Sequence, residues 1–496
     1  MDGSIYSPDQ RDEWMERLVL AIAVGIAVFA ARPYAGSWND GSRLATVETL
    51  VDQHTWIIDH STFVQVPAAR DSITSLPYDP AEPALLKHGT QDKLFIEGHY
   101  YSDKSPVPAL LMAGCYRVWQ GATGWTACAQ PARFCRAMTL ISSGLAYVLA
   151  VLCIYRLGRP LRLSGSLRLA LTGSFALGTV ALPYVQHVNN HILLLGVTAA
   201  LMLGVAWLFE ELRLGCVSWR RFAGLGALAG LGYTIDLGAG PMILLCTALL
   251  ILNVSRLRLS TTPQAARCER VTALSPCLIF GLAALPWLVL HHALNYAIGG
   301  SFKPANANPA YFDWPGSPFD VRNLTGSWIH NGPLSFLLYA ASMLAGKRGF
   351  LGHNLPLFLT MPALAILLHH HREKCRNVLW AAGCCFGTWI LYAATSNNSS
   401  GQCCSIRWFV PLLAPGYYIL AIFLQRYPEY RRDFVILSVW GLLLVVFMRE
   451  GPWIQHMVRF FWPIQAAALS TWALCHYLRN RITLGRCLES PTKPAE

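Results

Sequence analysis

One carboxylate of the chain stands where it could act on a hydroxyl group. Asp40 lies in the stretch 38–45, shortly after a first apolar run over 18–31. If that run crosses a membrane, the carboxyl group lies close to the membrane surface. A partly desolvated acid there has a raised pKa and can accept a proton from a hydroxyl. The structural alternative is that Asp40 caps a helix that continues through Val51.

A second stretch of polar residues could hold a phosphate. Residues 99–106 end in Asp103, Lys104, Ser105 and Pro106, and a mainly apolar run follows. Pro106 suits the first turn of a helix, so Lys104 is expected near a helix N-terminus, which already favours anions. In the structural alternative, Asp103 and Lys104 form an ion pair that only orders the loop.

The elements that must position these residues are apolar segments of membrane-spanning length. The 496 residues are 54% hydrophobic and only 13% charged, outside the usual balance of soluble domains. Charge-poor runs of roughly 17 to 25 residues, the length that crosses a bilayer, recur along the chain. We therefore predict an all-α, polytopic integral membrane protein with about 12 spans. The predicted spans are 18–31, 137–155, 169–185, 192–209, 222–235, 237–252, 272–290, 355–368, 378–394, 408–424, 434–448 and 460–478.

Two long polar segments interrupt the spans. The first, 34–133, has scattered charge and no run of spanning length, so we expect an extracytoplasmic loop that contains interfacial helices and the candidate residues. The second, 295–353, includes the short apolar segment 335–345, which is expected to lie in the interface, with a re-entrant segment as the alternative. A single membrane domain over 1–496 is expected, and its other parts are the first span 18–31, core spans in 137–290, C-terminal spans in 355–478 and a cytoplasmic tail in 479–496.

The positive charges predict the orientation of the spans. The formal net charge is +12, and its Lys and Arg residues lie in short segments between apolar runs. They form neither a stripe with exposed aromatic residues nor a basic tail, which argues against nucleic-acid binding. The clusters of Lys and Arg in the short loops all fall on the same side of the predicted membrane, which predicts cytoplasmic N- and C-termini. Asp236, in the hairpin 222–252, is then expected at the outer tip or as a buried ionisable group.

These motifs, in this order, resemble the GT-C superfamily of membrane glycosyltransferases. Residues 40–45, Asp-Gly-Ser-Arg-Leu-Ala, are similar to the family pattern Asp-Glu-x-Arg-Tyr-Ala. Residues 100–107, Tyr-Tyr-Ser-Asp-Lys-Ser-Pro-Val, are similar to Tyr-Phe-x-Asp-Lys-Pro-Pro-Leu. The segment 399–411, in which Arg407 begins a late apolar run, resembles a Gly-rich outer loop of the family. The similarity is greatest to the branch with the aminoarabinose transferase of lipid A and the protein O-mannosyltransferases.

The resemblance implies an enzyme that moves a sugar from a polyprenyl-phosphate donor to an acceptor on the extracytoplasmic face. It makes Asp40 the base that takes the acceptor proton. Lys104 and Arg407, with Arg43, would hold the departing lipid phosphate. For Arg407 the alternative is interfacial anchoring beside Trp408.

Four further residues join the substrate-binding set that the resemblance implies. Tyr101 and Asp103 belong to the second motif. Asn190 and His191 occupy an outer turn where family members often carry a second acidic residue, and an ordinary turn is the alternative. The Pro- and Asn-rich segment 303–326 could cover a sugar site by stacking and hydrogen bonding, or form a lid without substrate contact.

The resemblance also implies partners and a location. The partners are a polyprenyl-phosphate sugar as co-substrate, a lipid, glycan or protein acceptor, and membrane lipids. The expected location is the bacterial inner membrane, in the service of the cell envelope. No cofactor or metal is expected, because cations can stabilise the phosphate leaving group and the 15 cysteines lack metal-ligand spacing.

One position departs from the family pattern. Gly41 stands where the family has a Glu beside the Asp, so one carboxylate must orient and deprotonate the acceptor. Glu48 and Asp52 lie further along the same predicted helix and do not replace it. Two other classes therefore stay open, namely a transporter or flippase of lipid-linked sugars and a catalytically silent membrane protein of the same fold.

Overall fold

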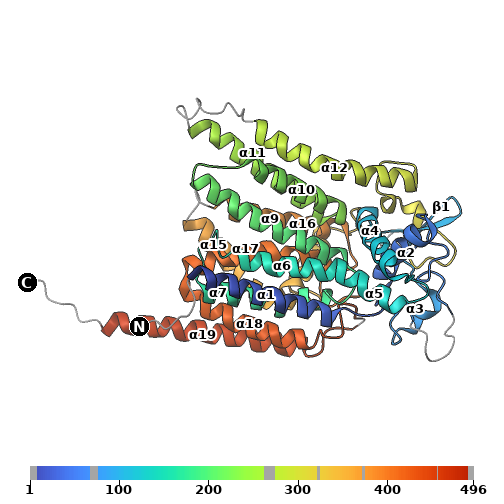
Figure 1. Ribbon diagram of the computed structural model, residues 1–496. Helices are drawn as coiled ribbons and strands as arrows, with labels where there is room; N and C mark the ends of the chain where they lie inside the picture. The colour runs from blue at the N-terminus through green and yellow to red at the C-terminus, as the bar shows by residue number, and fades with distance from the viewer. Residues whose placement is uncertain are drawn as a thin grey trace, which may run out of the picture.

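Long helices packed side by side form most of the molecule. The structure is a computed structural model that describes residues 8–67, 76–261, 274–320, 324–370, 375–454 and 456–489. Short helices and one small sheet cluster at one end of the long helices (Figure 1). The helical character expected from the sequence is confirmed.

Six helical segments of the described chain are long and apolar enough to cross a membrane, and a seventh is possible if one bent pair counts as a single span. Four of them are single helices, namely α9 (Asn190–Arg213), most of α11 (Ala239–Thr261), α12 (Leu274–Gly299) and α16 (Arg376–Thr395). The segment Pro131–Arg156 joins α5 (Pro131–Thr139), η2 (Leu140–Gly144) and α6 (Leu145–Arg156). The segment Arg407–Arg426 joins η9 (Arg407–Leu412) and α17 (Leu413–Arg426).

Other predicted spans correspond to shorter helices. α7 (Gly165–Leu177), α10 (Trp219–Ile235) and α18 (Arg431–Val446) have 13, 17 and 16 residues. At about 1.5 Å per residue each is shorter than the roughly 30 Å hydrocarbon core of a bilayer. The predicted count of about 12 spans is therefore not confirmed. The bundle also contains α1 (Pro8–Ala30), α8 (Ala181–Tyr184) and α19 (Phe461–Glu489).

The predicted interfacial segment belongs to a sharply bent element. It corresponds to α13 (Pro333–Ala345), which is followed by α14 (Phe350–His353), η7 (Leu355–Leu359) and α15 (Thr360–His370). Together Pro333–His353 and Leu355–His370 are apolar enough to span a membrane, but the chain bends by 115° between them. This bend is that of a broken span or a re-entrant loop, the second of which the sequence left open.

The first long polar segment folds into a body with its own core, here called the loop body (residues 34–67 and 76–134). Its elements are α2 (Trp38–Glu48), η1 (Thr49–Gln53), α3 (Pro83–His88), β1 (Lys93–Ile96), β2 (His99–Ser102), α4 (Pro106–Thr123) and the start of α5. Aliphatic and aromatic side chains fill the core of the loop body, among them Leu44, Phe63, Tyr116 and Phe134. A rigid body can therefore present the polar residues.

A tight hairpin that the sequence did not predict leads to the Lys104 motif. β1 and β2 are antiparallel, with Leu94 opposite Tyr101. Glu97 and Gly98 form the turn, and both have positive φ, 51° and 89°, as a two-residue hairpin turn requires. Each strand has four residues, too few for a clear alternating pattern.

Candidate functional site

Asp40 lies in the first turn of α2 and is held by short-range contacts. Ser37 is the N-cap residue, and its hydroxyl accepts from the backbone N–H groups of Asn39 and Asp40. The Asp40 carboxylate accepts from the Gly36 backbone N–H at 2.6 Å and from the Ser37 hydroxyl. This reciprocal arrangement resembles a capping box. The N-cap residue is Ser37 and not Asp40, which supports the cap from the first turn of the helix.

The surroundings of Asp40 keep its proton affinity high. Asp40 is fully buried, and burial raises its pKa to about 6 against the opposing hydrogen bonds from Ser37 and Gly36. His187 Nδ1 lies 3.4 Å from Asp40 Oδ2. Burial lowers the pKa of His187 to about 4, and Arg32 adds to this shift, so the imidazole is neutral at neutral pH. In the described chain, Asp40 therefore has no ion pair with a permanently charged cation.

The space beside Gly41 explains why the second acid is missing. A Cβ atom on Gly41 would lie 2.3 Å from the Tyr78 hydroxyl oxygen and 2.9 Å from its ring. Tyr78 is fully buried, and its hydroxyl donates to the Phe63 carbonyl at 2.6 Å. The aromatic ring thus fills the volume that a Glu side chain would need.

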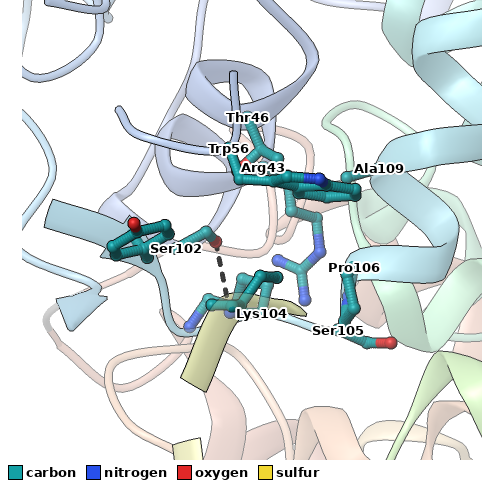
Figure 2. A pocket seen from close by; sticks show the side chains of 10 residues that line it. Arg43, Thr46, Trp56, Ser102, Lys104, Ser105, Pro106 and Ala109 are labelled. Carbon is teal, nitrogen blue, oxygen red and sulfur yellow. Dashed lines mark hydrogen bonds between the residues drawn. The ribbon is translucent and has the colours of Figure 1, made fainter. Parts of the chain in front are cut away.

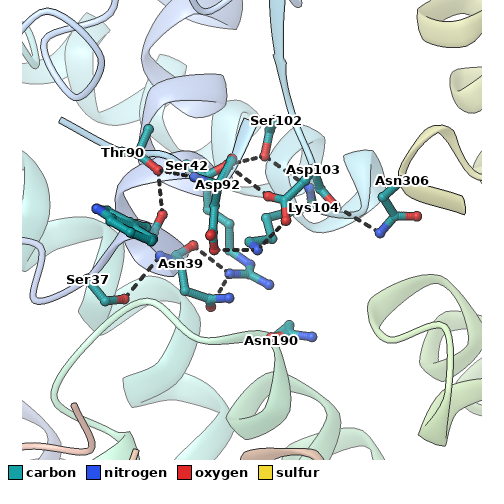
Figure 3. Close-up of polar contacts among 12 residues, drawn as sticks. Ser37, Asn39, Ser42, Thr90, Asp92, Ser102, Asp103, Lys104, Asn190 and Asn306 are labelled. Atoms are coloured by element: carbon teal, nitrogen blue, oxygen red, sulfur yellow. Dashed lines mark hydrogen bonds and ion pairs between the residues drawn. The ribbon is translucent and has the colours of Figure 1, made fainter. Parts of the chain in front are cut away.

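Lys104 lies between two carboxylates. Its ammonium is 2.6 Å from Asp92 Oδ2 and 2.7 Å from Asp103 Oδ2, and all three side chains are nearly buried (Figure 3). Asp103 follows β2, whereas Asp92 precedes β1, so the hairpin brings them together. The Asp103–Lys104 pair that the sequence allowed is present, but it is part of a triad.

The two carboxylates of this triad titrate differently. Burial raises the pKa of each, and Lys104 opposes this. For Asp92 the attraction to Lys104, together with that to Arg407 and Arg43, outweighs burial, and the net shift of the pKa is downward. For Asp103 the net shift is upward, and repulsion by Asp92 adds to it. Asp92 therefore gives up its proton more readily than Asp103 does.

Two contacts join the triad to its neighbours. The Ser42 hydroxyl donates to the Asp92 carbonyl and lies 2.6 Å from the Ser102 hydroxyl, which ties α2 to the hairpin. Asn306 Nδ2 donates to the Asp103 carbonyl at 2.9 Å. Asn306 therefore joins the segment after α12 to the motif around Lys104.

A small pocket opens beside this triad. Arg43, Trp56, Tyr101 and Lys104 line it, and Figure 2 shows Arg43 and Lys104 beneath the indole of Trp56. A second small pocket beside it shares Lys104 and is lined also by Asp103. The structure thus brings four of the predicted site residues together around these pockets.

Arg43 is a buried cation held by neutral groups. Its guanidinium donates to the Asn39 backbone carbonyl at 2.7 Å and to the Asn39 side-chain oxygen at 2.5 Å. Burial lowers the pKa of Arg43 to about 10; Asp103 opposes this shift and Arg407 adds to it. Arg407 is thus close enough to repel Arg43 electrostatically.

Arg407 stands at the first residue of η9. Its backbone N–H donates to the Ser400 hydroxyl at 3.0 Å, and its guanidinium carbon lies 5.7 Å from the centre of the Trp453 ring. Its Nε is buried and has no hydrogen-bond partner in the part of the chain that the structure describes. Within the described residues, neither Arg43 nor Arg407 forms a salt bridge with a carboxylate. Two neighbouring guanidinium groups without such a partner form a natural place for an anion.

Asn190 and His191 lie at the start of α9 and face Asp236. Asn190 Nδ2 donates to Asp236 Oδ2 at 3.1 Å, and His191 Nδ1 lies 3.2 Å from the same atom. Asp236 also accepts from the Tyr392 hydroxyl at 2.6 Å and from the backbone N–H groups of Gly238 and Ala239. Asp236 lies at the turn between α10 and α11, and its side chain is buried.

Several buried polar atoms near the ends of α9 and η9 have no hydrogen-bond partner among the residues that the structure describes. They are Asn189 Nδ2, Asn190 Oδ1, Ser405 Oγ, Arg407 Nε and Trp453 Nε1. Buried polar groups are normally paired with protein or water. This concentration, on helices that pack together, therefore marks a region suited to a polar ligand.

The candidate residues do not all line the same pocket. Asp40 and Arg407 are not among the residues that line the pocket beside Lys104. Sequence reasoning missed Asp92, Trp56 and His187, which contact or line the site. None of these belongs to a motif, and only the fold brings them close. The described residues contain no group of three or more metal-binding side chains.

Comparisons with known proteins returned solved structures alone. No protein-family model matches the chain, and no curated protein matches it. The chain is similar to the crystal structure of ArnT from Cupriavidus metallidurans bound to undecaprenyl phosphate, with 11% identity and a TM-score of 0.47 over 93% of this chain and 75% of that one. The apo structure of the same ArnT gives 12% identity and a TM-score of 0.46 over the same shares.

A third similar structure is the oligosaccharyltransferase AglB from Archaeoglobus fulgidus, in complex with an inhibitory peptide and a dolichol-phosphate. The identity is 13% and the TM-score 0.42, over 93% of this chain and 56% of that one. ArnT and AglB are members of the GT-C superfamily, which the sequence motifs resemble.

Proposed function

We propose that the protein is a membrane glycosyltransferase that moves a sugar from a polyprenyl-phosphate donor to an acceptor at the outer membrane face. The observation that carries the proposal is the pair of guanidinium groups of Arg43 and Arg407, which lie near one another and form no salt bridge within the described chain. A phosphate can satisfy both by charge-assisted hydrogen bonds.

Lys104 is a third cation near this site, but Asp92 and Asp103 already pair with it. Arg43 and Arg407 have no such carboxylate partner within the described residues. Their charges therefore favour the phosphate of the donor and, more strongly, the greater negative charge that develops on it as the sugar leaves.

Asp40 is the base in this proposal. Unlike Asp92 and Asp103, it has no ion pair with a lysine, and its pKa of about 6 lies near the pH at which such an enzyme works. A base with this pKa is largely ionised at pH 7 yet still binds a proton well. Because Asp40 is covered in this structure, the acceptor hydroxyl must displace the contact with Ser37 to reach it.

The reaction needs one displacement at the anomeric carbon. The acceptor oxygen forms the new bond to that carbon, and the bond from the carbon to the phosphate oxygen breaks. The hydroxyl proton goes to Asp40, and the electron pair of the broken bond stays on the lipid phosphate, beside Arg43 and Arg407. The aromatic side chains of Trp56 and Tyr101, which line the pocket beside Lys104, are suited to pack on a sugar ring.

The site also agrees with the proposed setting of the reaction. The loop body joins the ends of the long helices (Figure 1), so a lipid can present its phosphate there while its chain stays in the membrane. The proposal places this end outside the cytoplasm, with both termini inside. It requires no metal or organic cofactor, because the arginines and the lysine stabilise the leaving group.

A transfer assay tests the proposal. Membranes that contain the wild-type protein or Asp40→Asn receive a polyprenyl-phosphate donor with a labelled sugar, and transfer to acceptor is counted. We expect transfer by the wild type, a loss of at least about 100-fold in Asp40→Asn, and no loss in the matched variant Asp313→Asn, whose side chain is exposed.

Two other outcomes would contradict the proposal in different ways. Equal transfer by the wild type and Asp40→Asn would remove Asp40 from the reaction. Movement of the intact lipid-linked sugar across vesicles without transfer would indicate a flippase, and neither activity with any donor would indicate a catalytically silent protein.

A further inference from the structure

A large groove lies at the end of the bundle opposite the loop body. Its volume is about 390 Å³, and its walls come from the end of α6 and the residues after it, the second half of α9 and the start of α10. α6 begins beside the loop body and runs away from it, and α10 returns toward Asp236 (Figure 1). The groove is therefore remote from Arg43 and Arg407.

The shape of the groove follows from the packing of three helices. α6 and α10 both pack against α9 and contact each other little. The strip of α9 between them forms the floor, where Ala200, Leu203 and Gly204 lie. Leu225 and Leu228 of α10 complete an apolar surface. An apolar groove of this kind between membrane helices can receive an acyl chain.

The rim of the groove is basic. Arg156 and Arg159 lie on one wall, and Arg220 and Arg221 lie on the other. Trp207 also lines the groove, and tryptophan is common at the level of lipid headgroups. An apolar floor below a basic and aromatic rim matches the order of groups along a phospholipid.

The acids near this rim do not neutralise it. Arg156 pairs with Glu16 at 2.5 Å, Arg159 pairs with Asp12 and Glu16, and Arg221 pairs with Glu211 at 2.5 Å. Asp12 is shared further with Arg168.

Arg220 has no salt bridge in the described chain, and its guanidinium carbon lies 5.8 Å from the centre of the Trp219 ring. Five arginines thus face three carboxylates, which leaves two positive charges in excess. A monoanionic or dianionic headgroup would complement this surplus.

We propose that this groove binds an anionic phospholipid, with the phosphate beside Arg220 and Arg221 and one acyl chain along Leu203, Leu225 and Leu228. This lipid would be a bound partner of the fold and is separate from the sugar donor. The proposal does not depend on the transfer reaction, because the groove shares no residue with the pockets beside Lys104.

A glycine in the groove allows a test that leaves every charge in place. Gly224 lines the groove, and a Cβ atom added there meets no atom within 4 Å. Gly224→Leu therefore adds an apolar side chain to the groove, and its Cβ meets no neighbouring atom. Gly281 is the matched control, because it is an exposed helical glycine in α12, outside the groove, with equally open space.

Native mass spectrometry of the full-length protein in mild detergent gives the readout. The protein is titrated with phosphatidylglycerol or phosphatidylcholine. We expect the wild type to bind phosphatidylglycerol at least about fivefold more tightly, as one uncompensated arginine near a headgroup implies. Gly224→Leu should lose the tight class of bound lipid, and Gly281→Leu should keep it.

A charge variant and a competitor complete the test. Arg220→Gln should weaken phosphatidylglycerol about fivefold and leave phosphatidylcholine unchanged. Arg213→Gln, at the same end of the bundle but paired with Glu210 outside the groove, should have no such effect. Equal binding of the two lipids, an equal loss in Gly281→Leu, or equally strong binding of water-soluble glycerol phosphate would overturn the proposal.

Discussion

Replacement of Lys104 by Met should destabilise the loop body strongly. The ammonium is 2.6 and 2.7 Å from two carboxylates, and the three side chains are only 11–12% exposed. Without Lys104, Asp92 and Asp103 would repel each other in a site with little water. Loss of one partner from a buried ion pair costs about 3 kcal/mol or more. Protonation of Asp103, whose pKa is already raised by burial, should recover part of that cost at low pH.

Thermal denaturation in detergent measures this effect. We expect the melting temperature of Lys104→Met to fall by about 3 °C or more at pH 7, and by less at pH 5. Adding Asp92→Asn should restore most of the loss, because it removes the repulsion. Lys87→Met, at an exposed lysine of α3, should change little. An unchanged melting temperature in Lys104→Met would refute the buried triad, whatever its effect on activity.

Three further predictions concern neighbouring positions. Gly41→Ala should destabilise the protein by about 1–3 kcal/mol in the same assay, because the added Cβ meets the buried ring of Tyr78. The control Gly114→Ala, at an open helical position, should be neutral or slightly stabilising. Transfer by the wild type should fall about tenfold per pH unit below pH 6, where Asp40 becomes protonated, and a flat profile from pH 5 to 7 would contradict this. Tyr392→Phe should cost about 1.5 kcal/mol in melting experiments, because Asp236 loses its 2.6 Å hydrogen bond.

Local patterns predicted much of the helical framework. Pro106 marks the first residue of α4, and α2 continues into η1 as far as Gln53, as the apolar positions after Asp40 indicated. The apolar runs correspond to helices along the described chain. The number of spans did not follow as surely, because helices such as α7, with 13 residues, are apolar but short.

The site was harder to predict because its partners come from different parts of the chain. Lys104 was found from its motif, but its contact with Asp92 depends on a hairpin of two four-residue strands. From the sequence, Gly41 is interpreted as the loss of the Glu that the family pattern has at this position. Only the position of Tyr78 in the structure shows why a side chain does not fit there. His187 reaches Asp40 from before α9, and no spacing in the sequence indicates that contact.

Binding of a polyprenyl phosphate to the purified protein tests the central claim most directly. The account predicts saturable binding that weakens about 10- to 100-fold in Arg43→Gln and in Arg407→Gln, as loss of a hydrogen bond between charged groups implies. Arg449→Gln, at an exposed arginine near the end of α18, should bind like the wild type. Equal binding by all four proteins would contradict the account.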